Sequence, residues 1–300
     1  MKFADPKNDL AFKKIFGDLN HKNILISFLN SVLDFKDTQI IVDVSLANPY
    51  QIPKIPELKE TILDIKATNK NGDTFIIEMQ KKDLADFTKR SLYYTSKAYI
   101  EQLPKGNNYT VLKKVYFIGI LNFNIFENKN FISRHLIINT ETNTQDLDDF
   151  EFSFIELPKF TKSLEHLDSL LDKWIYFIQN ASNLSVIPSQ YENLKEFQEA
   201  FIIATQTTWD KKELEVYDYI TLKEFDELNA LRTAERKGME KGIKKGIEQG
   251  IEQGIEQGEQ GIEQGKIEIA KNLLDILDDE TIASKTNLSV DLIRSLRFKK

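Results

Sequence analysis

The chain has 300 residues, no cysteine and a formal net charge of −7. The missing cysteines exclude disulfides and thiolate metal sites, and the negative charge argues against a generic nucleic-acid binder. The composition is ordinary for a soluble protein, no apolar run approaches the roughly 18 residues that span a membrane, and the start lacks the apolar core of a signal peptide. We therefore expect a cytoplasmic protein without membrane contact.

Two helices and a strand are predicted at the start of the chain. A first helix runs from about residue 5 to Gly17, with an apolar stripe that includes Phe12 and Ile15. Asp9 lies on this helix one turn before Lys13, a spacing that by itself is typical of a surface ion pair. The pattern then predicts a helix over 23–33, a strand over 39–46 and a loop with three prolines over 48–56.

Residues 61–82, TILDIKATNKNGDTFIIEMQKK, are predicted to form a β-hairpin, because Asn71-Gly72 tolerates the positive φ of a tight turn. Glu78 and Gln80 share one face of the second strand, since side chains alternate along a strand. An in-register hairpin places Asp64 opposite them, so two carboxylates converge in apolar surroundings. There an ionised carboxylate is costly unless it is paired or binds a metal. The alternative is a set of charges on the wet face of an antiparallel hairpin.

A long helix over 84–103 is predicted next. Its Arg90, Tyr94 and Lys97 form one stripe, which suits a phosphate or, alternatively, is a solvated face with Tyr94 half-packed. Residues 1–110 contain 16 Lys+Arg and 14 Asp+Glu, so this part of the chain is mildly basic. Three further strands are predicted at 114–123, 132–139 and 150–157.

Asp64, the hairpin and Glu78-x-Gln80 resemble the core of the PD-(D/E)XK nuclease superfamily. They are more similar to the Rpn family of recombination-promoting nucleases and transposases, in which Gln replaces the final Lys. Three flanking stretches look like motifs of that family and occur in its order: NDLAFKKIFG (8–17), KRSLYY (89–94) and FIELPKF (154–160). The resemblance covers roughly residues 5 to 160. It implies an α/β, restriction-endonuclease-like core, a mixed β-sheet flanked by helices, followed by an α-helical C-terminal region.

The resemblance also implies a function, a Mg²⁺-dependent DNA endonuclease associated with recombination or transposition. Asp64 and Glu78 would hold Mg²⁺, with Mn²⁺ as a substitute and the backbone carbonyl of Met79 as a third ligand. Gln80 cannot supply a charge or act as a base, but its amide can orient water or a phosphate oxygen. The alternative is a catalytically degenerate protein that binds DNA or assembles with itself.

Four residues are candidate accessory groups. The resemblance favours Asp9, Arg90 and Tyr94. Lys66 is suggested by spacing alone, because it lies two residues after Asp64 and would supply the cation that Gln80 lacks.

Four regions follow from these patterns: a nuclease-like domain over 1–160, a helical region over 161–236, a glycine repeat over 237–266, and a small helical hairpin over 267–300. Within the helical region, helices are predicted at 164–178 and 191–207, followed by a charged run from residue 211.

The repeat has glycines at 238, 242, 246, 250, 254, 258, 261 and 265, most of them followed by an apolar residue. As a helix it forms a Gly–Ile stripe that drifts about 40° per repeat, and its glycines cost roughly 6–8 kcal/mol relative to alanine. Such a helix needs a partner surface. The alternative is a flexible spacer.

The tail has helix-turn-helix dimensions and a basic end, with Arg294, Arg297, Lys299 and Lys300. A helical hairpin that docks or oligomerises is favoured over a reader of DNA. We therefore expect a homo-oligomer held together by the C-terminal helices.

Overall fold

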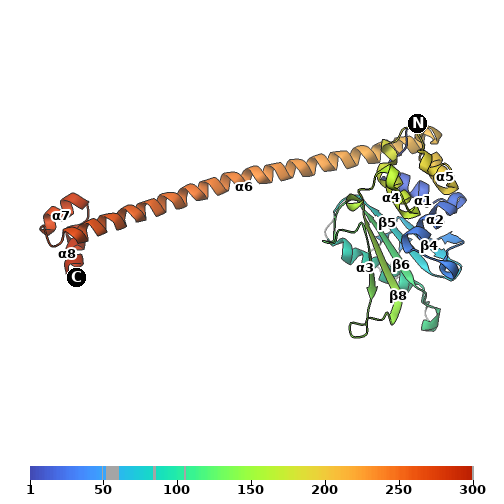
Figure 1. The fold of residues 1–300 in the computed structure, drawn as a ribbon, viewed down its shortest axis with the longest axis horizontal. Helices are drawn as coiled ribbons and strands as arrows, with labels where there is room; N and C mark the ends of the chain where they lie inside the picture. The colour runs from blue at the N-terminus through green and yellow to red at the C-terminus, as the bar shows by residue number, and fades with distance from the viewer. Residues whose placement is uncertain (49, 52–60, 84–85, 105, 299–300) are drawn as a thin grey trace. The chain divides into compact units, whose positions relative to one another are not determined.

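The computed structural model describes residues 1–48, 50–51, 61–83, 86–104 and 106–298. The chain divides into two compact units, Met1–Lys223 and Glu224–Lys300. The first unit holds a mixed β-sheet between two layers of helices, and the second unit is helical (Figure 1). This architecture confirms the restriction-endonuclease-like α/β core with a helical C-terminal region.

The first helix, α1 (Asp9–Phe16), begins later than predicted because Asn8 caps it. The Asn8 side chain accepts hydrogen bonds from the backbone N–H groups of Leu10 and Ala11, and Gly17 ends the helix as expected. The helix therefore begins with Asp9 in its first turn.

The strands of the main sheet are β1 (Val44–Leu46), β4 (Ile65–Asn69), β5 (Thr74–Gln80), β6 (Val115–Leu121), β7 (Ile132–Ile137) and β8 (Leu147–Glu156). Their order is β1-β4-β5-β6-β8-β7, in which β5, β6 and β8 are parallel and the other neighbours antiparallel. Two short strands, β2 (Tyr50–Gln51) and β3 (Thr61–Ile62), pair separately. The rest of the predicted loop at 48–56 lies mostly outside the described residues.

The predicted hairpin joins β4 to β5. The Asn69 side chain accepts hydrogen bonds from the N–H groups of Asn71 and Asp73, and Gly72 has the positive φ, +88°, that this turn requires. The turn sets the register, which pairs Ile65 with Ile77.

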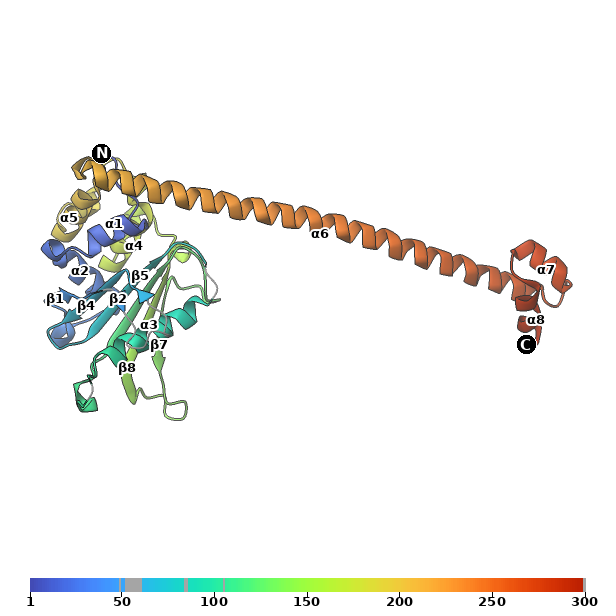
Figure 2. The same cartoon turned by 180° about the vertical axis from the view of Figure 1, so that it is seen from behind.

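The other helices of the first unit are α2 (Lys22–Leu33), α3 (Phe87–Glu101), α4 (Leu170–Asn180) and α5 (Lys195–Ala204). The side chains of alternate residues of β5 point to the two opposite faces of the sheet. Phe75 and Ile77 belong to the core shared with α1, α2, α4 and α5, whereas Ile76 packs with Phe87 and Ala98 of α3. Figure 2 shows this arrangement from behind.

The helices after residue 160 share the core of the first unit. Trp174 of α4 stacks on Phe197 of α5, with ring centroids 3.9 Å apart, and lies 5.7 Å from the ring of Phe16 in α1. The change of pattern near residue 160 therefore marks a change from strands to helices within one unit.

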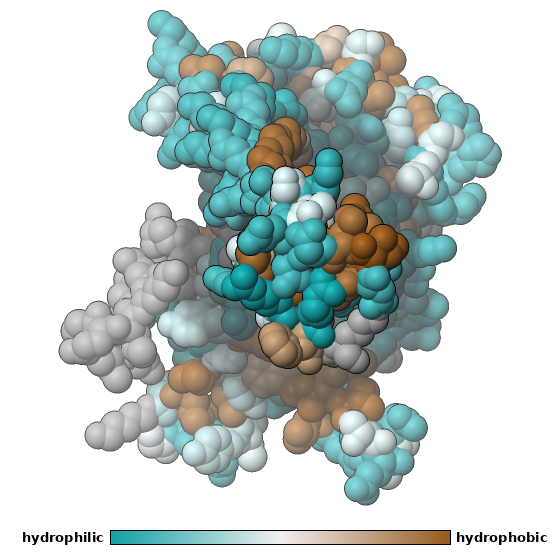
Figure 3. Space-filling view, turned by 90° about the vertical axis from the view of Figure 1, so that its left-hand side faces the viewer, coloured by the Kyte–Doolittle hydropathy of each residue, from teal (hydrophilic) through white to brown (hydrophobic). Residues whose placement is uncertain are grey.

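The glycine repeat is helical and lies wholly within α6 (Lys211–Leu273). α7 (Asp279–Thr286) and α8 (Val290–Phe298) pack against the end of α6 through a core of Ala270, Leu274, Ile282, Ala283 and Ile293. Apolar side chains (brown) also reach the surface among polar ones (Figure 3). The exposed apolar residues of the second unit include Ile276 and Phe298. Among the described helices, α6 included, none has both the length and the apolar composition needed to cross a membrane.

Two basic residues of the tail, Arg294 and Arg297, form ion pairs inside this hairpin. Arg297 pairs with Asp279 at 2.8 Å and donates hydrogen bonds to the carbonyl oxygens of Leu274 and Leu277. Its guanidinium therefore closes the helical hairpin, and Lys299 and Lys300 lie outside the described residues.

Candidate active site

Asp64 and Glu78 lie side by side where β4 begins. Because Ile65 pairs with Ile77, the preceding Asp64 and the following Glu78 meet across the hairpin. The Asp64 N–H donates to Glu78 Oε1 at 3.1 Å, and the Met79 N–H donates to Asp64 Oδ2 at 2.8 Å. Each carboxylate is thus held by the backbone of the opposite side of the hairpin.

Both carboxyl groups are largely removed from water, and Glu78 is only 5% exposed. Burial raises the pKa of Asp64 to about 6, against the opposing effects of the Met79 N–H and Lys13. Burial and the nearby charge of Asp64 raise the pKa of Glu78 to about 8. Ionising both groups is therefore costly unless a cation joins them.

Lys13 of α1 reaches the pair, although the sequence did not single it out as a site residue. Its Nζ lies 2.7 Å from Asp9 Oδ1 and 3.4 Å from Asp64 Oδ1. The candidate Asp9 is thereby joined to Asp64 through one ammonium group. The available signal was the one-turn spacing of Asp9 and Lys13 within the 8–17 motif, but that spacing does not say what the helix packs against.

Lys66 lines the groove beside Asp64, but its ammonium group pairs with a different carboxylate. Its Nζ is 2.8 Å from Glu101 Oε2 at the end of α3. Lys66 is opposite Ile76 in the hairpin register, so it lies on the face of the sheet that also carries Glu78. In the described structure, Lys13 is the lysine that pairs with Asp64.

Gln80 and Met79 complete this end of β5. Gln80 shares the face of Glu78, and its Nε2 donates to the carbonyl oxygen of Lys82 at 3.0 Å. The N–H and C=O of one residue point to the same side of a strand, so the Met79 carbonyl lies on the side where its N–H meets Asp64.

Arg90 and Tyr94 of α3 approach from the other side. Arg90 Nε and Nη2 each lie 3.3 Å from Tyr94 Oη, and the guanidinium is 5.5 Å from the ring centroid of Phe87. The charge of Arg90 opposes the rise in the pKa of Glu78. The structure therefore places Arg90 within electrostatic range of Glu78, and Tyr94 is in contact with Arg90.

A further buried carboxylate fixes the loop beside the site. Glu156, at the end of β8, accepts hydrogen bonds from the N–H groups of Ile125 and Phe126 at 2.6 and 3.1 Å, and pairs with Lys159 at 2.6 Å. The parallel register places Glu156 level with Gln80 across the intervening β6. The FIELPKF stretch thus anchors the loop that follows β6 at the sheet edge near Gln80.

The donors in this site suit a hard divalent cation. Mg²⁺ is commonly held by one or two carboxylates, with water and substrate phosphate completing its shell. Within the described residues, no three His, Cys, Asp or Glu side chains gather as a fuller metal-binding group. Two carboxylates and a backbone carbonyl are consistent with Mg²⁺, and a groove of about 280 Å³ lined by Lys13 and Asp64 opens beside them.

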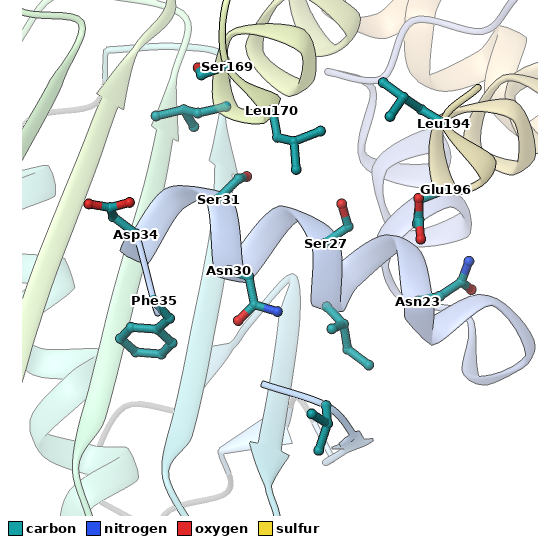
Figure 4. A pocket seen from close by; sticks show the side chains of 13 residues that line it. Asn23, Ser27, Asn30, Ser31, Asp34, Phe35, Ser169, Leu170, Leu194 and Glu196 are labelled. Carbon is teal, nitrogen blue, oxygen red and sulfur yellow. The ribbon is translucent and has the colours of Figure 1, made fainter. Parts of the chain in front are cut away.

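Another groove, of about 630 Å³, lies between α2 and the starts of α4 and α5 (Figure 4). Two of its polar side chains have structural roles. Asn30 is hydrogen-bonded to the backbone of Ile41, and Ser27 accepts a hydrogen bond from Trp174 Nε1. None of the predicted site residues lines this groove, so it gives no support to a second catalytic centre.

Residues 6–234 match the family described as PD-(D/E)XK nuclease family transposase. No curated protein and no solved structure matches the chain. The matched range includes α1, the hairpin with its two carboxylates, α3, and the helices α4 and α5. The match covers well over half of the chain, which therefore belongs to the PD-(D/E)XK nuclease family of transposases.

Proposed function

We propose that the protein is a Mg²⁺-dependent DNA endonuclease that acts in recombination or transposition. The observation that carries the proposal is the pair of Asp64 and Glu78, tied together by backbone hydrogen bonds and largely withdrawn from water. Membership of the family supports nuclease chemistry in general. The buried pair of oxygen ligands supports the divalent cation, with Mn²⁺ as a substitute.

In this proposal Asp64, Glu78 and the Met79 carbonyl hold the metal. Bound Mg²⁺ would stabilise negative charge on the scissile phosphate and lower the pKa of an attacking water. The bend at Asp64 and the end of β5 keep the two carboxylates in place before substrate arrives, because each accepts a backbone hydrogen bond.

Charge and orientation come from the surrounding side chains. Lys13 supplies the positive charge that Gln80 lacks, since its ammonium lies 3.4 Å from Asp64 beside the open groove. Gln80 positions water or a phosphate oxygen through its amide. Arg90 offers a planar donor group for a phosphate, steadied by Tyr94.

DNA binding without cleavage is the second candidate function. It is favoured by Gln80, which stands where the superfamily motif has Lys and whose amide nitrogen already donates to the Lys82 carbonyl. In that case DNA would be retained by the basic groups of α3, and the carboxylate pair would be inert.

Relaxation of a supercoiled plasmid over a Mg²⁺ and Mn²⁺ titration distinguishes the two functions. We expect wild-type nicking that EDTA abolishes and that Asp64→Asn removes. Glu151→Gln is the matched control. It also replaces a carboxylate of the sheet by an amide, but this carboxylate pairs with Lys114 at 2.9 Å and is not one of the proposed metal ligands. DNA binding by the wild-type protein without any Asp64-dependent cleavage would refute the nuclease proposal and favour the second function.

A further inference from the structure

α6 carries a regular row of exposed apolar side chains. Met239, Ile243, Ile247, Ile251 and Ile255 recur every four residues. The four isoleucines are 57–59% exposed, and Met239 is 71% exposed. Single exposed apolar residues are ordinary on protein surfaces, but a continuous row of them indicates a contact surface.

The glycines beside this row have no packing role within the described chain. A Cβ added at Gly242, Gly246, Gly250 or Gly254 would meet no described atom within 4 Å other than its chain neighbours and the nearby backbone of α6 itself. Glycine weakens an exposed helix relative to alanine, so these positions are unfavourable for the isolated helix. A glycine does, however, let another backbone approach closely. The row and its glycines together therefore fit a partner outside the chain.

The charges around Ile247 indicate which partner fits. Residues 232–246 contain six Lys+Arg and two Asp+Glu, whereas residues 248–262 contain four Asp+Glu and no Lys or Arg. A second copy in parallel register would place basic beside basic and acidic beside acidic. An antiparallel copy centred on Ile247 would place each basic half opposite an acidic half. Flanking charges of this kind set partner choice and orientation in paired helices.

We propose that α6 pairs with α6 of a second copy of the chain, antiparallel and crossing at Ile247. Ile243 of one copy then lies against Ile251 of the other, and Ile247 meets its own twin. The four-residue step overshoots a helical turn by about 40°, so two straight helices meet only near the crossing point. The pairing uses no residue of the candidate active site, so it can be tested independently of DNA cleavage.

Sedimentation of the full chain tests whether the row is the interface. We expect a wild-type dimer and, for Ile247→Glu, a dissociation constant raised at least about tenfold, because two carboxylates face each other at the two-fold axis. Gln249→Glu adds the same charge about 200° around the helix and should sediment as the wild type does. A monomeric wild-type protein would overturn the proposal and would indicate that the apolar row of α6 contacts a different partner. Equal sedimentation of both variants as dimers would also overturn it.

Disulfide trapping tests the orientation, and the absence of native cysteine makes it unambiguous. In the antiparallel pair, the twins of residue 243 lie about 12 Å apart along the helix, too far for a disulfide. We expect Ile243→Cys and Ile251→Cys chains to cross-link when mixed and neither to cross-link alone. Cross-linking of each variant with itself would indicate a parallel pair and overturn the proposal. Asp64→Asn should dimerise as the wild type does, which separates this result from any failure of nuclease activity.

Discussion

Asp64 donates its backbone N–H to Oε1 of Glu78 at 3.1 Å, so the second carboxylate is held by the main chain of the first. An amide oxygen can accept the same hydrogen bond, which allows the charge to be removed while the contact is kept. The two residues can therefore be tested for chemistry separately from their contribution to the fold.

We expect Asp64→Asn and Glu78→Gln each to abolish Mg²⁺-dependent cleavage. Each variant removes one of the two charged metal ligands. Among the described residues, no third carboxylate joins them in a metal-binding group that could compensate for the loss. Plasmid nicking measures the activity, and thermal melting with circular dichroism checks the fold. Cleavage by both variants at the wild-type rate would rule out the proposed metal ligands.

The metal-free protein should lose stability as the pH rises. The pKa of Asp64 is raised from 3.8 to about 6 and that of Glu78 from 4.5 to about 8, mainly by burial. A raised pKa in the folded state gives stability that is fully present below the ordinary value and is lost as the pH passes through the folded value. Each pKa unit corresponds to about 1.4 kcal/mol.

Urea unfolding in EDTA at about pH 5 and about pH 9 would measure this loss. Glu78→Gln should flatten the pH dependence because it removes the group with the larger rise. Mg²⁺ should stabilise the wild-type protein most at the higher pH, where the two carboxylates are ionised. An unchanged slope in Glu78→Gln would show that other groups control it.

Lys13→Met should slow cleavage by about 10- to 1,000-fold, the range of one lost electrostatic contact. The same substitution should tighten Mg²⁺ binding, since a cation 3.4 Å from Asp64 is removed. Lys14→Met is the matched control. It makes the same change on the same helix, but Lys14 pairs with Glu213 and lies 5.4 Å from the Trp209 ring centroid.

Nicking rates and calorimetric Mg²⁺ titrations of the two lysine variants give the comparison. A similar loss of activity in Lys14→Met would attribute the effect to the general charge of α1. Only a loss confined to Lys13→Met supports a role at the site.

Gln80→Ala should slow cleavage by about 10- to 1,000-fold, because an amide positions a reactant without carrying charge. Gln80→Lys should stay active, since Lys is the residue of the general motif. Gln102→Ala is the control, as its amide bonds to the Lys113 backbone away from the carboxylates. If Gln80→Ala cleaves as fast as the wild type, the amide has no part in the reaction.

The sequence predicted the part of the site that depends on local rules. The turn at Asn71-Gly72 and the alternation along β5 are enough to set Glu78 opposite Asp64. Lys13 could not be assigned in this way, because its distance to Asp64 depends on how α1 packs on the sheet. The ion pair of Lys66 with Glu101 likewise depends on how α3 packs on the sheet, which the spacing of Lys66 and Asp64 does not reveal.

The sequence pattern did not show how the helices after residue 160 and the glycine repeat are used in the fold. Residue 160 is a true change from strand to helix patterns, but the Trp174–Phe197 stack that joins the helices to the core is a tertiary contact. For the repeat, the weak helix propensity of glycine and the regular isoleucine row pointed in opposite directions. Neither local signal decides between a helix and a spacer.

Both tryptophans of the chain lie in the first unit, so the two units differ in their fluorescence. Trp174 is fully buried and Trp209 lies 5.4 Å from the Tyr217 ring, both within the first unit, and residues 224–300 contain no tryptophan. Intrinsic fluorescence therefore reports only on the first unit, whereas far-ultraviolet ellipticity is dominated by helices of both units. If ellipticity falls on heating before the emission shifts, the glycine-rich helix melts while the sheet and its carboxylate pair remain folded.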